Sequence, residues 1–352
     1  MLMVIFGAGA SYDSIPAHPP HAGAFFKTAT NRSVIGSDQR LPLANELFAD
    51  RTDFARWILQ FERCQPIIPL LRKASENSMV EGALENLQKE AGEYPERFRQ
   101  LAAIRYYLHG MLWECDLKWQ EAAGGVTNYK TLLDQIQRWR KPSQQICLVT
   151  FNYDRMLETA LTSVGINIQE LRDYIGSDQY KVIKVHGSVN WAREVNSSIA
   201  DLNNRNVWQV AHELIDRAPD LDISEKYSIV REYPIAKLSN QALFPALAIP
   251  VEAKRQFECP EEHLAELCEF IPKVTKILIV GWRATEEHFL KLLRDNLSMV
   301  DLRIMAVSGS IDEANKVGER IEHAGINCKF EAGKRGFTEF IENREGDDFL
   351  KI

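Results

Sequence analysis

The sequence predicts an α/β fold in which a parallel β-sheet is covered by helices and interrupted by a large helical insertion. Short, continuously apolar runs such as Leu2–Phe6 and 146–150 are typical of strands buried on both faces. Toward the end of the chain such runs alternate with segments of helical length, which favours parallel strands joined by right-handed crossovers. Between residues 41 and 140 apolar side chains recur at intervals of three and four, which indicates about four helices.

The elements outside the insertion follow from the same patterns. Apolar or β-branched runs predict strands at 2–6, 146–150, 180–185, 243–250, 276–281, 302–307 and 327–330. Helical spacing predicts helices at 155–164, 260–270, 285–297 and 311–324. We expect a loop at 16–38 and mostly irregular chain at 192–243, with a weak helical signal at 207–215. The predicted domains are a sheet domain of residues 1–40 and 141–352 and a helical insertion of residues 41–140.

Composition and charge exclude several classes of protein. The chain has 352 residues, of which 45% are hydrophobic and 26% charged, as in ordinary globular proteins. The net charge of −7 disfavours general binding of nucleic acid, so we expect no direct nucleic-acid partner. No apolar stretch approaches the ~20 residues that cross a bilayer, and the N-terminus looks like a strand rather than a signal peptide. None of the six cysteines forms a C-x-x-C pair, so we expect no metal site and a cytoplasmic location.

Four of the predicted strands end in residues that suit ligand binding. In open parallel sheets, ligands bind beyond the carboxyl ends of the strands. The four strand ends are Gly7-Ala8-Gly9-Ala10-Ser11, Thr150-Phe151-Asn152-Tyr153-Asp154, His186-Gly187-Ser188 and Gly281-Trp282. We therefore expect these segments to meet around one ligand.

The glycine turn after the first strand favours an anion but does not define one. Gly7 and Gly9 would let backbone amides approach a phosphate at the start of a helix. The third glycine of the dinucleotide fingerprint is absent, because Tyr12 stands there, so a dehydrogenase of the usual kind is disfavoured. A tight turn without a ligand remains an alternative. Gly281 could likewise admit a ligand, whereas Trp282 could stack on a ring or, as we prefer, pack in the core.

Two side chains at the other strand ends could carry chemistry. Asn152 offers both donors and an acceptor to a ribose, a carboxamide or a water molecule, and Asp154 adds a negative charge. The local alternative is that Asn152 favours a turn and Asp154 caps the following helix. His186 could act as a base near neutral pH, although a structural hydrogen bond is the commoner role of a lone histidine.

Taken in order, the four strand ends resemble the sirtuin-like (silent-information-regulator-type) family of NAD-binding proteins. Sirtuins carry Gly-Ala-Gly-x-Ser, Thr-Gln-Asn-x-Asp, His-Gly and Gly-Thr-Ser at the corresponding points. The forms Phe-Asn-Tyr-Asp and His-Gly-Ser found here are closer to the bacterial branch associated with NAD cleavage in antiphage defence. The resemblance covers residues 1–16 and about 145–340, and it implies a Rossmann-like sheet. The zinc-binding cysteine pairs of the deacylases are absent, and only Ile15-Pro16 remains of their Gly-Ile-Pro-Asp-Phe-Arg segment.

The resemblance implies NAD+ as the substrate, with no zinc ribbon. Asn152 would contact the ribose next to nicotinamide or position water, and His186 would act as the base, which makes these two the predicted catalytic residues. The amides of residues 7–11 would hold the pyrophosphate, and Asp154 would bind the carboxamide. The predicted NAD+-binding residues are Gly7, Ala8, Gly9, Ala10, Ser11, Thr150, Phe151, Asp154, Gly187, Gly281 and Trp282.

The resulting hypothesis is an NAD+ glycohydrolase that releases nicotinamide and ADP-ribose as an NAD-depleting effector of antiphage defence. A non-catalytic sensor of NAD or ADP-ribose is the alternative from a different class, and an NAD-dependent deacylase is less favoured because the cysteine pairs are missing. The resemblance makes a homo-oligomer and a HerA-type ATPase or Argonaute partner plausible. The helical block at 41–140 is either the surface for such partners or a lid that packs over the sheet.

Overall fold

A computed structural model describes residues 1–14, 41–77, 79–123, 126–233, 235–250, 257–298 and 301–351. The loop predicted at 16–38 lies outside the described residues. The chain divides into two units. The first, here the sheet unit, comprises residues 1–41, 115–185 and 261–352, and the second unit comprises residues 42–114 and 186–260.

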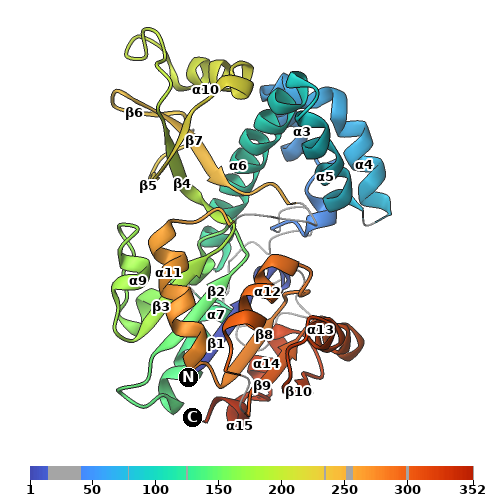
Figure 1. Ribbon diagram of the computed structural model, residues 1–352, viewed down its shortest axis with the longest axis vertical. Coiled ribbons are helices and arrows are strands. Elements are labelled where there is room, and N and C mark those ends of the chain that lie inside the picture. The colour runs from blue at the N-terminus through green and yellow to red at the C-terminus, as the bar shows by residue number, and fades with distance from the viewer. Residues whose placement is uncertain are drawn as a thin grey trace. The chain divides into compact units, whose positions relative to one another are not determined.

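The sheet unit is built on six parallel strands, labelled in Figure 1. The strands are β1 (Leu2–Phe6), β2 (Ile146–Thr150), β3 (Tyr180–Lys184), β8 (Lys276–Val280), β9 (Arg303–Val307) and β10 (Lys329–Ala332). All five residues of β1 are fully buried, because β1 lies between two parallel neighbours and is covered on both faces. The continuously apolar sequence of β1 is therefore the consequence of its central position.

The order of the strands sets the place where a ligand is expected. Across the sheet the order is β10-β9-β8-β1-β2-β3, so the chain moves outward from β1 first in one direction and then, after β3, in the other. This is the doubly wound Rossmann order, in which the switch point lies between β1 and β8. The structure thus confirms the predicted α/β class with a Rossmann-like parallel sheet.

The helices of the sheet unit are held by their apolar stripes. In α7 (Asn128–Trp139) the buried side chains Tyr129, Leu132, Leu133 and Ile136 follow helical spacing, and Thr127 caps the helix by accepting the Lys130 amide at 3.3 Å. Helix α7 packs against α8 (Met156–Leu161), α14 (Phe337–Glu342) and α15 (Asp347–Leu350). The other helices of this unit are α1 (Ala8–Asp13), η4 (Thr162–Val164), α9 (Asp173–Gly176), α11 (Glu261–Phe270), η6 (Ile271–Lys273), α12 (Glu287–Asn296) and α13 (Ile311–His323).

The second unit combines helices with a small antiparallel sheet of order β5-β4-β7-β6 (Figure 1). Its strands are β4 (Gly187–Val195), β5 (Ile223–Ile229), β6 (Lys237–Leu238) and β7 (Gln241–Leu247). Its helices are η2 (Ala44–Glu46), α3 (Thr52–Gln60), η3 (Glu62–Ile67), α4 (Ile68–Glu76), α5 (Val80–Ala91), α10 (Val207–Asp216), η5 (Ala218–Asp220) and α6 (Pro95–Ala123), which continues into the sheet unit.

Two expectations differ from this arrangement. The stretch 192–243 is not mostly irregular, because it contains the end of β4 and all of β5; the half-exposed strand β5 has too few apolar residues to reveal a period. The helical block predicted at 41–140 is divided differently, with 115–140 grouped with the sheet and 186–260 grouped with 42–114. No break in composition marks that boundary, because α6 runs through it without interruption.

Candidate functional site

Asn152 is the centre of a polar cluster at the carboxyl edge of the parallel sheet. It follows β2 and is only 6% exposed. Its Nδ2 lies 2.9 Å from the Gly7 carbonyl oxygen, 2.9 Å from Ser11 Oγ and 3.0 Å from Tyr129 OH, so its two hydrogens are shared among three acceptors. Its backbone N–H donates to Thr150 Oγ1 at 3.1 Å, which fixes the turn. The structure therefore brings the predicted residues of the first two strand ends together.

These contacts determine which end of the Asn152 side chain faces outward from the cluster. The Gly7 carbonyl oxygen can only accept, so the atom beside it must be the amide nitrogen. The carboxamide oxygen, Oδ1, then points away from Gly7, and no hydrogen bond from the described part of the chain reaches it. The cluster thus uses the donors of Asn152 internally and, among the described residues, gives its acceptor oxygen no hydrogen-bond donor.

Asp154 is anchored within the protein through both of its carboxylate oxygens. Oδ2 accepts from Ser11 Oγ at 2.7 Å, and Oδ1 accepts the backbone N–H of Met156, the first residue of α8, at 3.0 Å. Asp154 thus binds the first amide of α8 from the position before Arg155, the N-cap residue, and its predicted contact with a carboxamide stays a prediction. Burial raises the pKa of Asp154 to about 6, while the positive charge of Lys184 lowers that pKa.

A buried lysine supports the turn that carries Asn152 and Asp154. Lys184, the last residue of β3, is fully buried and donates to the backbone carbonyl of Asp154. Its Nζ pairs with Glu158 Oε1 at 2.9 Å, and Tyr174 OH donates to the same oxygen at 2.8 Å. A charge at this depth is tolerated only when it is paired and hydrogen-bonded. Lys184 and Glu158 thus link the end of β3 to the start of α8.

The glycines at the switch point pack backbone against backbone. A Cβ atom on Gly281 would lie 2.3 Å from the Ala10 nitrogen, and Gly281 has φ +63°, a conformation that favours glycine. The amides of Gly7 and Gly9 donate to the carbonyls of Val280 and Gly281 at 3.0 and 3.1 Å. The amide of Ala10 donates to the Gly7 carbonyl. The glycine turn therefore has a structural role, and these three amides are already engaged within the protein.

Aromatic residues that follow β2 and β8 pack together at the same edge. The rings of Phe151 and Trp282 stack with centroids 4.9 Å apart and an interplanar angle of 11°, and Phe289 meets both edge-on. Trp282 is 3% exposed, which agrees with the preferred core interpretation. Its Nε1 donates to Glu286 Oε2 at 2.6 Å. Helix α12 begins after Glu286 without a side-chain cap, and the Glu286 carboxylate accepts the tryptophan N–H instead.

The remaining predicted residues, His186 and Gly187, belong to the second unit. His186 is 4% exposed, and its carbonyl accepts the Ala248 amide at 3.0 Å. Gly187 begins β4 with φ +77°, and a Cβ there would lie 2.0 Å from the Ala246 carbonyl oxygen, so only glycine fits. Along the chain, His186 directly follows Val185, whose amide donates to the Thr150 carbonyl at 3.1 Å.

Tyr129 is a member of the cluster that the sequence pattern does not reveal. It lies on α7, in a segment predicted to belong to the helical insertion, and it is 1% exposed. At the level of sequence it is one more apolar position of an amphipathic helix. A possible signal is that its helical stripe includes a tyrosine, whose hydroxyl needs a partner when it is buried.

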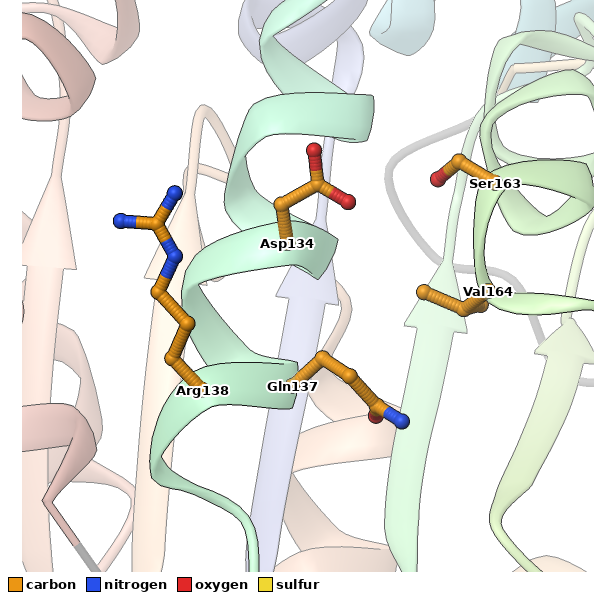
Figure 2. Close-up of a pocket in the computed structure, with 5 residues that line it drawn as sticks. All are labelled: Asp134, Gln137, Arg138, Ser163 and Val164. Carbon is orange, nitrogen blue, oxygen red and sulfur yellow. The ribbon is translucent and has the colours of Figure 1, made fainter.

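A surface hollow of about 480 Å³ lies elsewhere on the sheet unit, between α7 and η4. Figure 2 shows its lining residues, Asp134, Gln137 and Arg138 from the helix and Ser163 and Val164 opposite them. None of the predicted site residues lines this hollow. Its wide opening and exposed walls distinguish it from the buried cluster around Asn152.

The described part of the chain shows neither a metal-binding group nor a membrane-spanning helix. Within the described ranges, no group of three or more histidine, cysteine, aspartate or glutamate side chains is arranged to hold a metal ion. Among the helices that the structure describes, none combines the length and apolar character needed to span a membrane.

The fold and the site define the class of protein: a doubly wound α/β unit with a polar cluster at the carboxyl edge of its sheet. Residues 146–327 match the family model described as "SIR2-like domain", which is more than half of the chain. The protein therefore belongs to the SIR2-like domain family, whose function is related to NAD. This confirms the predicted sirtuin-like family.

Other comparisons add little to this assignment. A solved structure described as "The Structural basis of Sirtuin Substrate Affinity" aligns over 98% of this chain and 94% of its own, with 12% sequence identity and a TM-score of 0.36. The search of the curated proteins gave no match.

Proposed function

We propose that the protein is an NAD+ glycohydrolase that cleaves NAD+ to nicotinamide and ADP-ribose. Membership in the SIR2-like domain family supports the use of NAD+. The observation that carries the proposal is the orientation of Asn152, whose amide nitrogen is held by three acceptors while its oxygen is left for a ligand. An oriented amide oxygen is suited to a ribose hydroxyl or to a water molecule that attacks the ribose.

The reaction needs little besides positioning and electrostatic stabilisation. The bond between C1′ of the ribose and the nicotinamide nitrogen breaks, and nicotinamide leaves with the electron pair as a neutral molecule. Water then forms the new C1′–O bond and loses a proton. In the proposed mechanism Asn152 holds the ribose or the water, and His186 accepts the proton.

The position of His186 in the chain supports this division of roles. Strands β2 and β3 are parallel neighbours in register, so the chain leaves both at the same edge of the sheet. Asn152 follows the first of these strands, and His186 is the second residue after Lys184, the last residue of the other. The proposal does not depend on phosphate binding by the glycine turn, because the amides of Gly7, Gly9 and Ala10 are engaged within the protein.

The biological role that we propose is depletion of NAD+ in antiphage defence. Its support is the resemblance of the Phe-Asn-Tyr-Asp and His-Gly-Ser segments to the bacterial branch of sirtuin-like proteins. Because loss of NAD+ is toxic to a healthy cell, we further propose that the activity depends on assembly into an oligomer or on a protein partner.

The test is chromatography of NAD+ after incubation with the purified protein over a wide range of protein concentration. We expect equal amounts of nicotinamide and ADP-ribose, and a loss of activity of about 100-fold or more in Asn152→Ala and in His186→Ala. Asn196→Ala and His323→Ala are the matched controls, because both residues are exposed and neither is a predicted site residue. Equal consumption of NAD+ by all variants would contradict the assignment. Binding of NAD+ without release of nicotinamide would favour the sensor.

A further inference from the structure

Tyr129 is packed among aromatic rings next to Asn152. Its ring packs against Phe6 with centroids 4.8 Å apart and meets Phe337 edge-on at 5.8 Å. The side chain is 1% exposed, so in this structure its hydroxyl is not a group that can touch a substrate. That hydroxyl lies 3.0 Å from Asn152 Nδ2 and 2.8 Å from Ser11 Oγ.

The hydrogen atoms of this cluster can be assigned from the chemistry of their partners. Ser11 Oγ donates to the Asp154 carboxylate at 2.7 Å, which uses the only proton of the serine hydroxyl. The 2.8 Å contact between Ser11 and Tyr129 must then have the phenol as its donor. The phenol oxygen keeps its lone pairs to accept from Asn152 Nδ2. Burial raises the pKa of Tyr129 well above its ordinary value, so the phenol stays protonated at neutral pH.

The direction of this chain of hydrogen bonds gives the phenol a specific role. Tyr129 OH donates to Ser11 Oγ, which donates to the Asp154 carboxylate. The hydroxyl oxygens of Ser11 and Tyr129 therefore both present a lone pair to Asn152 Nδ2. An arrangement with the carboxamide reversed would place Oδ1 against the Gly7 carbonyl oxygen, two acceptors facing each other. The Gly7 carbonyl thus excludes the reversed carboxamide, and the phenol adds a second acceptor that holds Nδ2 in the observed orientation.

We propose that Tyr129 is a positioning residue that fixes the carboxamide of Asn152, so that Oδ1 is presented to the ribose or the attacking water. This inference rests on the proposed function for the chemistry that Asn152 performs. It extends the site from the strand ends to α7, which lies in the segment predicted to form the helical insertion. Tyr129 acts through Asn152 and does not itself touch the reacting atoms.

The test compares Tyr129→Phe with Tyr180→Phe. Tyr129→Phe removes the hydroxyl and keeps the ring that packs on Phe6. Tyr180 is also a buried tyrosine of the sheet unit, and its hydroxyl donates to Gln137 at 3.0 Å, but it lies at the first residue of β3, away from the carboxyl edge. We expect kcat for NAD+ cleavage to fall about 10- to 100-fold in Tyr129→Phe with KM changed by less than about twofold, and both constants to be retained in Tyr180→Phe.

A second measurement needs no turnover. In protein labelled with ¹⁵N only at asparagine, the Asn152 side-chain amide signals are identified by their loss in Asn152→Ala. We expect these signals to shift and to exchange faster with solvent in Tyr129→Phe, and to be unchanged in Tyr180→Phe. Unchanged Asn152 signals in Tyr129→Phe, or a kcat equal to that of Tyr180→Phe, would overturn the inference. A wild-type protein that cleaves no NAD+ would contradict the proposed function instead, and the Asn152 signals would still decide whether Tyr129 orients the carboxamide.

Discussion

Replacing Asp154 by asparagine should change the pH dependence of folding stability. Burial raises the pKa of Asp154 from 3.8 to about 6. Because the folded state binds this proton more tightly than the unfolded chain, the contribution of Asp154 to stability is complete below pH 3.8 and is lost as the pH rises through 6. Asparagine has the same shape, does not titrate and keeps an oxygen that can accept the Met156 amide.

The size of the effect follows from the shift in pKa. A shift of one unit corresponds to 1.36 kcal/mol, so the ionisation of Asp154 costs the folded state about 3 kcal/mol at neutral pH. We therefore expect the free energy of unfolding of Asp154→Asn, minus that of the wild type, to increase by about 2.4 kcal/mol between pH 4 and pH 7. Above pH 7 the difference should be constant.

The assay is urea unfolding at a series of pH values, followed by circular dichroism. Asp178→Asn is the control, because it removes the same charge from an exposed residue of the same unit. The difference in the free energy of unfolding between Asp178→Asn and the wild type should vary little between pH 4 and pH 7. A difference for Asp154→Asn that stays flat, or that decreases as the pH rises, would refute the argument that burial dominates the environment of this carboxyl group.

Two further substitutions test the packing of the site. Gly281→Ala should destabilise the protein by about 2–5 kcal/mol, because φ +63° disfavours a side chain and the new Cβ would lie 2.3 Å from the Ala10 nitrogen. Thermal unfolding measures this loss of stability. A loss below about 0.5 kcal/mol would count against the packing of the two turns. Lys184→Met should lower the free energy of unfolding by about 3–5 kcal/mol, because Glu158 would remain buried without its charged partner. The double variant with Glu158→Met should recover much of this loss. A double variant no more stable than Lys184→Met alone would contradict the pairing.

The sheet could be predicted from the sequence because its central strands are buried and therefore consist almost entirely of apolar residues. β1 and β2 are apolar at nearly every position, and both have the predicted bounds. β5, with the sequence ISEKYSI, is half exposed, so packing rather than composition decides that it is a strand. The boundary between the units within α6 has no local signal, because an uninterrupted helix crosses it.

In the candidate site, too, features set by neighbouring residues could be predicted, whereas contacts between residues far apart in the sequence could not. The turn Thr150 to Asp154 could be predicted because polar residues follow an apolar strand directly. The contribution of Tyr129 could not, because it depends on the approach of a helix to a strand end 23 residues further along the chain. The internal use of the Gly7 and Gly9 amides could not either, since the carbonyls that accept from them belong to residues 280 and 281.

The central place of the first strand has a consequence for synthesis on the ribosome. Leu2 pairs with residues that lie 144 and 274 positions later in the chain, so β1 acquires its second neighbour only when β8 has been made. At about 5–20 residues per second, translation of that interval takes about 15–55 s. Throughout this time a fully apolar segment of the nascent polypeptide lacks at least one of its two neighbouring strands. Early binding of a chaperone, rather than the speed of the final sheet closure, should therefore govern the yield of folded protein.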